Sequence, residues 1–311
     1  MGGFGPGAAD PGVSLCERGL MSPFAKGLVW VGVSYSAAFC AAFFTFEACQ
    51  DCHPLWAMGA ADLAATLVIF GFSVGLRNAS LYDPYWSLIP LAISAHWALT
   101  GQGDPVRAVA LTGLIWFWGL RLTGNWVRGW PGVGHQDWRY EDLREKSGPF
   151  YPLVNLFGIH LCPTALVFMG CLPVFFSLHD PAPMEPLEWV AVVFGVGMVV
   201  LEWVADEQLW AFRKGRTHHD TFLQTGLWAW SRHPNYCGEA FFWVSLWAVA
   251  LAGGHGPYWT AAGALSMIGL FVFASIPMMK KKNLARKPGY AGYVARTSAF
   301  IPWPPKGRGE P

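Results

Sequence analysis

Residues 187–205 read Leu-Glu-Trp-Val-Ala-Val-Val-Phe-Gly-Val-Gly-Met-Val-Val-Leu-Glu-Trp-Val-Ala. Apart from Glu188 and Glu202, this run holds no charged side chain. The hydrocarbon core of a bilayer is about 30 Å thick, and a helix of about 20 apolar residues crosses it. The run therefore predicts a membrane-spanning helix. In the whole chain 53% of the residues are hydrophobic and only 13% are charged, which is too apolar for an ordinary soluble domain.

Similar apolar runs recur along the chain, and 187–205 is the sixth of eight. They predict an all-α fold, a polytopic membrane bundle of seven or eight transmembrane helices. The third and fourth runs are short. Pro90 and Arg107 within them favour helices that are tilted, partial or packed inside the bundle. The runs are residues 27–46, 56–76, 85–100, 106–120, 152–177, 187–205, 238–254 and 258–279.

The chain shows no linker, low-complexity tract or fixed repeat that would divide it into domains. We therefore expect a tail of residues 1–26 followed by one membrane domain, residues 27–311. Within this domain, residues 27–120 are mostly apolar. Residues 121–311 alternate apolar runs with polar segments rich in Arg and Trp, so we expect the chemistry there.

The basic residues predict the orientation of the bundle. Eight spans would place every Lys and Arg except Arg107 on one side of the membrane, and basic loops stay cytoplasmic. Both termini are then expected in the cytoplasm. Residues 1–26 hold no apolar stretch long enough for a cleavable signal. The expected location is an integral multi-pass protein of the endoplasmic reticulum in a eukaryote, or of the inner membrane in a bacterium.

A cysteine motif lies in a predicted non-cytoplasmic loop. Residues 49–53 read Cys-Gln-Asp-Cys-His, which fits the pattern of covalent haem attachment. A loop of this length cannot enclose a haem, and it offers no second ligand. We expect Cys49 and Cys52 to be two solvent-facing thiols or a local disulfide, and we expect no metal site in the protein.

The strongest candidate site is Ser-Arg-His-Pro-Asn-Tyr-Cys-Gly-Glu, residues 231–239, where a cytoplasmic segment enters the seventh span. Proline is favoured in the first turn of a helix, so Pro234 predicts a helix start next to His233. The free N–H groups of a helix start attract phosphate, and Arg232 adds a donor. Asn235 and Glu239 lie one turn apart, so we expect them to face each other on one side of the helix.

Three further clusters lie on the predicted cytoplasmic side. Arg121, Asn125 and Arg128 recur at helical spacing. After a break at Pro131-Gly132, Asp137, Tyr140 and Arg144 return to the same spacing. Glu202 is expected to face a polar interior or to carry a proton, one turn before Asp206, which could pair with Arg213. The tail combines Lys280-Lys281-Lys282 with regularly placed tyrosines, which suits anionic headgroups or a polyanionic ligand. The first of these clusters could equally be an interfacial amphipathic segment held by positive charge and tryptophan.

Tyr-Asp-Pro-Tyr-Trp, residues 82–86, opens the third span on the same side. Tyr and carboxyl groups near lipid depth are possible proton donors to a carbonyl or an olefin. We therefore single out Tyr85 as a possible catalytic acid, with Asp83 as the group that orients it. A turn followed by an aromatic belt would explain the same segment.

The segment 231–239, together with Phe-Ile-Pro-Trp at 300–303, resembles the steroid 5-alpha-reductase superfamily, specifically its uncharacterised branch of membrane proteins. The resemblance runs from about Leu81 to Pro305. It implies an integral membrane reductase that binds NADPH near the cytoplasmic face and reduces a carbon-carbon double bond conjugated with a carbonyl. The Gln-Glu pair with which steroid reductases hold the substrate ketone is not found, which argues against a steroid substrate. The cofactor pocket would contain Arg121, Asn125, Arg128, Asp137, Arg139, Arg144, Asp206, Arg232, His233, Asn235, Tyr236, Glu239, Tyr290 and Tyr293.

Two alternatives remain open. A membrane methyltransferase similar to isoprenylcysteine carboxyl methyltransferase shares an Arg-His-Pro-x-Tyr-x-Gly segment and would use S-adenosylmethionine. That family carries a Glu-Glu pair after its last span, where this chain has Lys280-Lys281-Lys282. A non-enzymatic lipid-binding protein is the second alternative. In each case the expected partners are membrane lipids and a lipidic small molecule, with no nucleic acid.

Overall fold

The computed structural model describes residues 22–216, 218 and 220–306. Within these residues the chain forms helices and no strand, apart from one isolated bridge between Ser231 and Ser298. The predictions for the N-terminal tail up to residue 21 lie outside the described residues. The main helices are α1 (Pro23–Ala48), α2 (Pro54–Gly75), α3 (Tyr85–Thr100), α4 (Pro105–Gly129), α5 (Trp138–Ser147), α7 (Cys162–His179), α8 (Pro186–Gly215), α9 (Pro234–Ala252), α10 (Ala261–Gly269), α11 (Ile276–Arg286) and α12 (Tyr290–Arg296).

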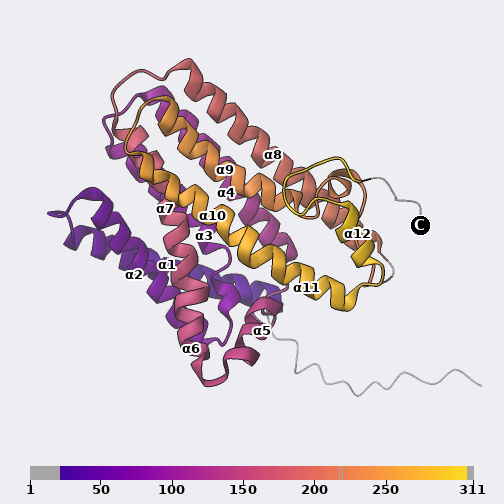
Figure 1. Ribbon diagram of the computed structural model, residues 1–311. Coiled ribbons are helices and arrows are strands. Elements are labelled where there is room, and N and C mark those ends of the chain that lie inside the picture. The colour runs from indigo at the N-terminus through magenta and orange to yellow at the C-terminus, as the bar shows by residue number, and fades with distance from the viewer. Residues whose placement is uncertain (1–21, 217, 219, 307–311) are drawn as a thin grey trace, which may run out of the picture.

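Two of the long continuous helices contain a π-helical segment. The short helix α6 (Tyr151–Leu153) continues through a π-helix, Val154–Leu161, into α7. Likewise α10 continues through a π-helix, Leu270–Ser275, into α11. In Figure 1, α8, α9 and the α10–α11 rod run along one another, and the α1–α2 hairpin lies to one side of them.

The predicted all-α membrane bundle is confirmed. Five helical segments are long and apolar enough to cross a membrane, namely Pro23–Ala48, Pro54–Gly75, Trp138–His179, Pro186–Gly215 and Tyr258–Arg286. The other three predicted spans correspond to α3, α4 and α9. Helix α3 has 16 residues, which reach only about 24 Å at 1.5 Å per residue. Helix α4 extends beyond its predicted end at residue 120, to Gly129, so Arg121, Asn125 and Arg128 do share one helix.

Proline marks the start of most long helices. Pro23, Pro54, Pro105, Pro186 and Pro234 each occupy the first helical position. Proline fits there because its missing N–H would have no partner within the helix and its φ is already helical. The sequence therefore sets these boundaries locally, before any packing between helices.

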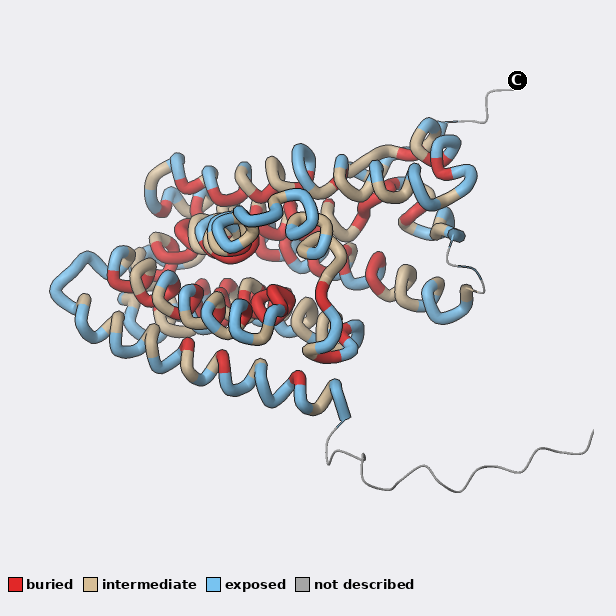
Figure 2. Tube along the Cα trace, turned by 90° about the horizontal axis from the view of Figure 1, so that it is seen from below, coloured by how far each residue is buried: buried red, intermediate tan, exposed pale blue. Residues whose placement is uncertain are grey.

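The core lies between α4, α7, α8, α9 and α10. Helices α8 and α9 approach closely at Gly238, where a Cβ atom would lie 2.7 Å from Cβ of Glu202 and 2.7 Å from the carbonyl oxygen of Met198. Small residues permit such close packing in membranes. The Trp118 ring stacks on Phe242 with 4.7 Å between ring centroids. Figure 2 shows the buried residues gathered on the inward faces of the helices, whereas α1 is largely exposed.

The polar loops gather at two ends of the bundle. At one end, the Asn78 side-chain amide donates to the carbonyl oxygens of Val133 and His135, and Arg232 N donates to the carbonyl oxygen of Ser298. We call this the basic end. It carries residues 76–84, 121–144, 213–216, 220–233 and 280–306. The opposite end carries residues 101–104, 180–185 and 253–257. Both groupings agree with the predicted loops.

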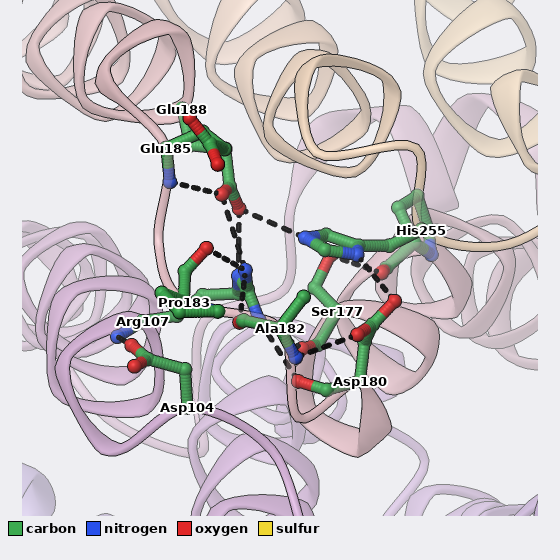
Figure 3. Close-up of polar contacts among 10 residues, drawn as sticks. Asp104, Arg107, Ser177, Asp180, Ala182, Pro183, Glu185, Glu188 and His255 are labelled. Carbon is green, nitrogen blue, oxygen red and sulfur yellow. Dashed lines mark hydrogen bonds and ion pairs between the residues drawn. The ribbon is translucent and has the colours of Figure 1, made fainter.

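Arg107, the one basic residue outside the predicted cytoplasmic set, is fully buried at the opposite end. Figure 3 shows its guanidinium among three chain segments. It pairs with Glu188 at 2.6 Å and donates to the carbonyl oxygens of Asp180 and Ala182 at 3.0 Å each. The His255 ring bridges Asp180 at 2.8 Å and Glu188 at 3.0 Å. This cluster ties the opposite-end loops together, and its partners were not predicted.

The Cys-Gln-Asp-Cys-His motif, residues 49–53, lies in the loop between α1 and α2. Cys49 and Cys52 are both free thiols, and of the two only Cys52 is exposed, whereas Cys49 is partly buried. The His53 side chain caps α2, because its Nδ1 accepts the N–H of Leu55 at 3.2 Å.

Candidate functional site

The start of α9 lies at the basic end and has the predicted form. Pro234 is the first helical residue and His233 is the N-cap, with no side chain bonded to the first turn. The N–H of His233 donates to Ser231 Oγ at 3.1 Å. The first-turn N–H groups and the positive end of the helix dipole are therefore available to an anionic ligand.

The C-terminal tail packs against this helix start. Arg232 donates through its backbone N–H to the carbonyl oxygen of Ser298 at 2.8 Å, and through Nε to that of Thr297 at 3.2 Å. The Tyr293 hydroxyl donates to the carbonyl oxygen of Trp228 at 2.5 Å. Tyr293 was predicted to close over a ligand, but its hydroxyl instead anchors the chain that leads to Arg232.

A buried cluster of acids lies one turn further into α9. We call it the acid chamber and define it by Arg121, Glu202, Asp206, Asn235 and Glu239. Arg121 pairs with Glu202, and with Asp206 at 2.9 Å. The Asn235 side-chain amide donates to Asp206 at 3.2 Å. Three helices, α4, α8 and α9, thus supply one connected polar group within the apolar bundle.

Two predicted pairings in the acid chamber are wrong. Asn235 does not bond Glu239. The two Glu239 oxygens instead accept the indole N–H groups of Trp118 at 2.7 Å and Trp243 at 2.8 Å. Asp206 pairs with Arg121 rather than with Arg213. Trp243 lies one turn after Glu239 on α9 itself. Trp118 and Arg121 come from α4, and spacing along α8 or α9 cannot reveal partners on another helix. Glu202 does face a polar interior, as predicted.

Several buried polar atoms at this place have no hydrogen-bond partner within the part of the chain that the structure describes. They are Nη1 of Arg232, Nε2 of His233, Oδ1 of Asn235 and Nε of Arg121. Arg232 is only 7% exposed and His233 only 4%. Burial first, and then the charge of Arg232, lower the pKa of His233 to about 4, so its imidazole is neutral. Since unpaired buried polar groups are costly, these atoms suit a polar ligand with anionic groups.

The segment before α5 borders the same place. Asp137 caps α5 and pairs with Arg139 at 2.9 Å. Although burial would raise the pKa of Asp137, the hydrogen bonds and charge of Arg139 hold it below its usual value. Asp137 and Arg139 lie near enough to act electrostatically on Tyr236 at the start of α9. The Tyr236 ring stacks on His233 with 5.1 Å and on Phe271 with 4.8 Å between ring centroids.

Two predicted cofactor residues have other partners at the rim. Arg128 pairs with Glu207 at 2.5 Å and lies over the Trp210 ring. Arg144 lies over the Tyr151 ring, with 4.7 Å between the guanidinium carbon and the ring centroid. Neither guanidinium belongs to the acid chamber. Asn125 does reach it, because its amide donates to Asp206 at 3.1 Å.

Tyr85 and Asp83 do not form the predicted pair. The Tyr85 hydroxyl donates to Asp62 Oδ1 at 2.7 Å, whereas Asp83 accepts from the Tyr140 hydroxyl at 2.5 Å. Asp83 and Tyr85 lie on either side of Pro84, and their side chains bond different helices, α5 for Asp83 and α2 for Tyr85. Asp62, which is 2% exposed in α2, was missed. The sequence did indicate Asp62, because a single acidic residue within an apolar membrane-spanning run is a candidate functional residue.

Further hydroxyl groups lie close to Tyr85 and Asp62. Thr164 Oγ1 lies 2.9 Å from Thr66 Oγ1 and 2.7 Å from the Tyr82 hydroxyl. The Tyr85 hydroxyl also lies 3.4 Å from the backbone carbonyl oxygen of Asp62. The second oxygen of Asp62, Oδ2, has no hydrogen-bond partner among the described residues. A carbonyl or hydroxyl group of a ligand could therefore be recognised between Tyr85 and Asp62.

One family model and one curated protein match the chain. The family model described as "Protein of unknown function (DUF1295)" matches residues 69–297. An uncharacterized protein of Schizosaccharomyces pombe, C594.04c, is 28% identical over 261 residues, which are 76% of this chain and 76% of that protein. No solved structure is significantly similar to the chain. Because the matched residues include the whole acid chamber and the start of α9, and cover most of the chain, this protein belongs to the DUF1295 family.

Proposed function

We propose that this protein is an integral membrane oxidoreductase that uses NADPH to reduce a carbon-carbon double bond in a lipidic enone or enoyl compound. The observation that carries the proposal is the start of α9. There, buried Arg232 and His233 and half-buried Asn235 present polar atoms without partners among the described residues, beside a helix N-terminus. The resemblance of residues 231–239 to the steroid 5-alpha-reductase superfamily supports the same reaction. The membrane would be the endoplasmic reticulum or a bacterial inner membrane, according to the source.

The residues present fit a dinucleotide. Arg232 and the first turn of α9 would hold phosphate groups, since both offer N–H donors to an anion. Asn235 offers an amide oxygen, and neutral His233 offers one ring nitrogen. When bound, NADPH supplies the hydride for the reduction. The basic residues of the tail suit the negative charge of its phosphates.

Tyr85 would supply the proton that the reaction also requires. Its hydroxyl is buried and has two acceptors on Asp62, the carboxylate oxygen Oδ1 at 2.7 Å and the backbone carbonyl oxygen at 3.4 Å. A substrate carbonyl in place of one of these partners would accept the Tyr85 hydrogen bond, so the proton could pass to the substrate. Asp62 would orient this donor, the role first predicted for Asp83. The apolar surroundings suit a substrate that enters from the bilayer.

One observation favours a second function. The acid chamber holds more carboxyl groups than guanidinium groups, and this excess suits the sulfonium cation of S-adenosylmethionine. A methyltransferase is therefore the second candidate. Lys280, Lys281 and Lys282 at the basic end favour the dinucleotide instead, because they suit phosphates and would repel a cation.

Ligand-induced stabilisation of the purified protein tests the proposal. We expect NADPH to raise the unfolding temperature in detergent more than S-adenosylmethionine does, since a ligand stabilises the state that binds it. Incubation with NADPH and extracted membrane lipids should yield a product heavier by two hydrogen atoms. Stabilisation by S-adenosylmethionine alone would favour the methyltransferase. No stabilisation by either compound would favour a lipid-binding protein without enzyme activity.

A further inference from the structure

His255 lies in the loop between α9 and α10, at the opposite end of the bundle, and both of its ring nitrogens face carboxylates. Nδ1 lies 2.8 Å from Oδ2 of Asp180, and Nε2 lies 3.0 Å from Oε1 of Glu188. The ring is therefore held between the end of α7 and the start of α8 (Figure 3). The number of protons on the ring depends on whether these oxygens accept or donate.

Both carboxylates act as acceptors. The two oxygens of Glu188 already accept from Nε and Nη2 of Arg107, at 2.6 Å and 3.1 Å. Oδ1 of Asp180 accepts the N–H of Ala182 at 2.9 Å. This N–H, and then the bond from His255, hold the pKa of Asp180 below its usual range. Neither acid has a proton to give, so both nitrogens of His255 donate, which only the doubly protonated, positively charged ring can do.

The loop is shaped around the His255 ring. A Cβ atom on Gly253 would lie 2.0 Å from Nε2 of His255, and one on Gly256 would lie 2.4 Å from Cγ of Phe176. Gly256 also has a φ of 75°, which favours glycine. The backbone N–H of His255 donates to the carbonyl oxygen of Ala250 at 2.7 Å. The ring therefore occupies a defined place, against Gly253 and between the two acids.

A cavity of about 100 Å³ lies beside the ring. Its wall contains His255, Tyr258 and Thr260, and Tyr258 is 79% exposed. A cavity of this size has room for water. Although His255 itself is only 3% exposed, it can therefore exchange protons with water at the end of the bundle that is predicted to be non-cytoplasmic.

We propose that His255 is a pH-sensitive switch, which holds the α9–α10 loop to Asp180 and Glu188 when doubly protonated and releases it when one proton passes to water. A neutral ring keeps one N–H, so its other nitrogen would present a lone pair to a carboxylate oxygen, and the two repel. The charged groups that face the ring are Asp180 after α7, Glu188 from α8 and, bonded to Glu188, Arg107 from α4.

The switch acts on the loop and not on the whole bundle. Arg107 stays paired with Glu188 after His255 has lost its proton, so α4 and α8 remain joined. Histidine is the side chain that ordinarily changes charge between about pH 5 and pH 8. The α9–α10 loop should therefore be held at the acidic end of this range and released at the basic end.

Hydrogen exchange of the full-length protein in detergent tests the switch. The reporter is the backbone N–H at position 255, which is bonded to Ala250. Its protection, corrected for the intrinsic exchange rate, should fall about tenfold or more from about pH 5 to about pH 8.5, because a bond to a charged group is lost. Constant protection over this range would overturn the inference.

Two variants locate the effect. His255→Gln removes the titrating ring, so protection at position 255 should no longer depend on pH. Asp180→Asn keeps the ring but offers it an amide that can donate to a neutral nitrogen, so the fall should become smaller. Where one variant fails to fold, the other gives the result.

The matched control is His135→Gln, which removes an exposed histidine at the basic end. It should keep the wild-type dependence of protection on pH. An equal fall in the wild type, in His255→Gln and in Asp180→Asn would assign the pH dependence to another group and overturn the switch.

Discussion

Nε of Arg107 on α4 lies 2.6 Å from Oε1 of Glu188 on α8, and neither side chain is exposed. Glu188 also contacts His255, so one carboxylate joins three segments at the opposite end of the bundle. Arg107→Met should lower the free energy of unfolding by about 3–5 kcal/mol, because it leaves Glu188 buried without its guanidinium. Denaturant unfolding in detergent would measure this.

The control for this prediction is an exposed ion pair. Lys146→Met removes the partner of Asp142 on α5, where both side chains are exposed to solvent. That loss should be about 0–1 kcal/mol. Equal losses for Arg107→Met and Lys146→Met would contradict the assignment of Arg107 as the main tie between the loops.

Arg232→Ala and Asn235→Ala should both weaken NADPH binding. Each removes a polar group that has an atom without a protein partner at the start of α9. A lost hydrogen bond to a charged group costs about 1.5–3 kcal/mol, or roughly tenfold to more than a hundredfold in affinity. Affinity would be measured by titration, with Lys146→Ala as a control that keeps wild-type binding. Normal folding and normal binding in both variants would exclude the helix start as the cofactor site.

Tyr85→Phe should leave NADPH affinity unchanged and lower turnover, because it deletes a hydroxyl and keeps the ring. Asp62→Asn should act in the same direction, since Asp62 accepts the Tyr85 hydrogen bond at 2.7 Å. Asp83→Asn should affect turnover less, because Asp83 bonds Tyr140. The measurement is the NADPH-dependent lipid product. Full turnover by Tyr85→Phe would remove Tyr85 as the proton donor.

Asp83 should make stability depend on pH. Burial raises the pKa of Asp83 to about 6, although Arg139 and Tyr140 oppose the rise. The folded protein therefore holds this proton more tightly than the unfolded chain, where Asp has a pKa of about 3.9. The resulting stability is complete below about pH 4 and is lost as the pH rises through about 6.

Asp83→Asn removes this titration and should flatten the fall in unfolding temperature between about pH 4 and pH 7. Thermal unfolding of both proteins across this range would show the difference. Asp142→Asn, at an exposed pair, serves as the control. Parallel pH curves for wild type and Asp83→Asn would mean that Asp83 does not titrate in this range.

Cysteine labelling tests the predicted orientation. Cys52 is exposed between α1 and α2 and should react with an impermeant reagent only from the non-cytoplasmic side. A cysteine introduced by Lys146→Cys in exposed α5 should react only from the cytoplasm. Tags at the two termini should be accessible from the same side. Termini on opposite sides would contradict a bundle with an even number of spans.

Much of the fold was determined locally by the sequence. Apolar runs long enough to cross a bilayer determine the all-α membrane class, since only a helix satisfies its own backbone in lipid. Proline at the first helical position set the starts of α4, α8 and α9. The sequence likewise predicted that Arg121, Asn125 and Arg128 share one helix, because their spacing is helical and all three lie on α4. These features depend only on neighbours along the chain.

The partners of the polar residues were decided only by the tertiary structure. Spacing suggested Asn235 with Glu239 and Tyr85 with Asp83, but the structure pairs Asn235 with Asp206 and Tyr85 with Asp62. A residue's position along one helix does not reveal which neighbouring helix it faces. That choice depends on helix rotation and on close approaches such as the one at Gly238, where α8 and α9 meet without an intervening side chain. In an apolar bundle, buried polar groups must find one another across helices, and their pairing follows from packing rather than from sequence order.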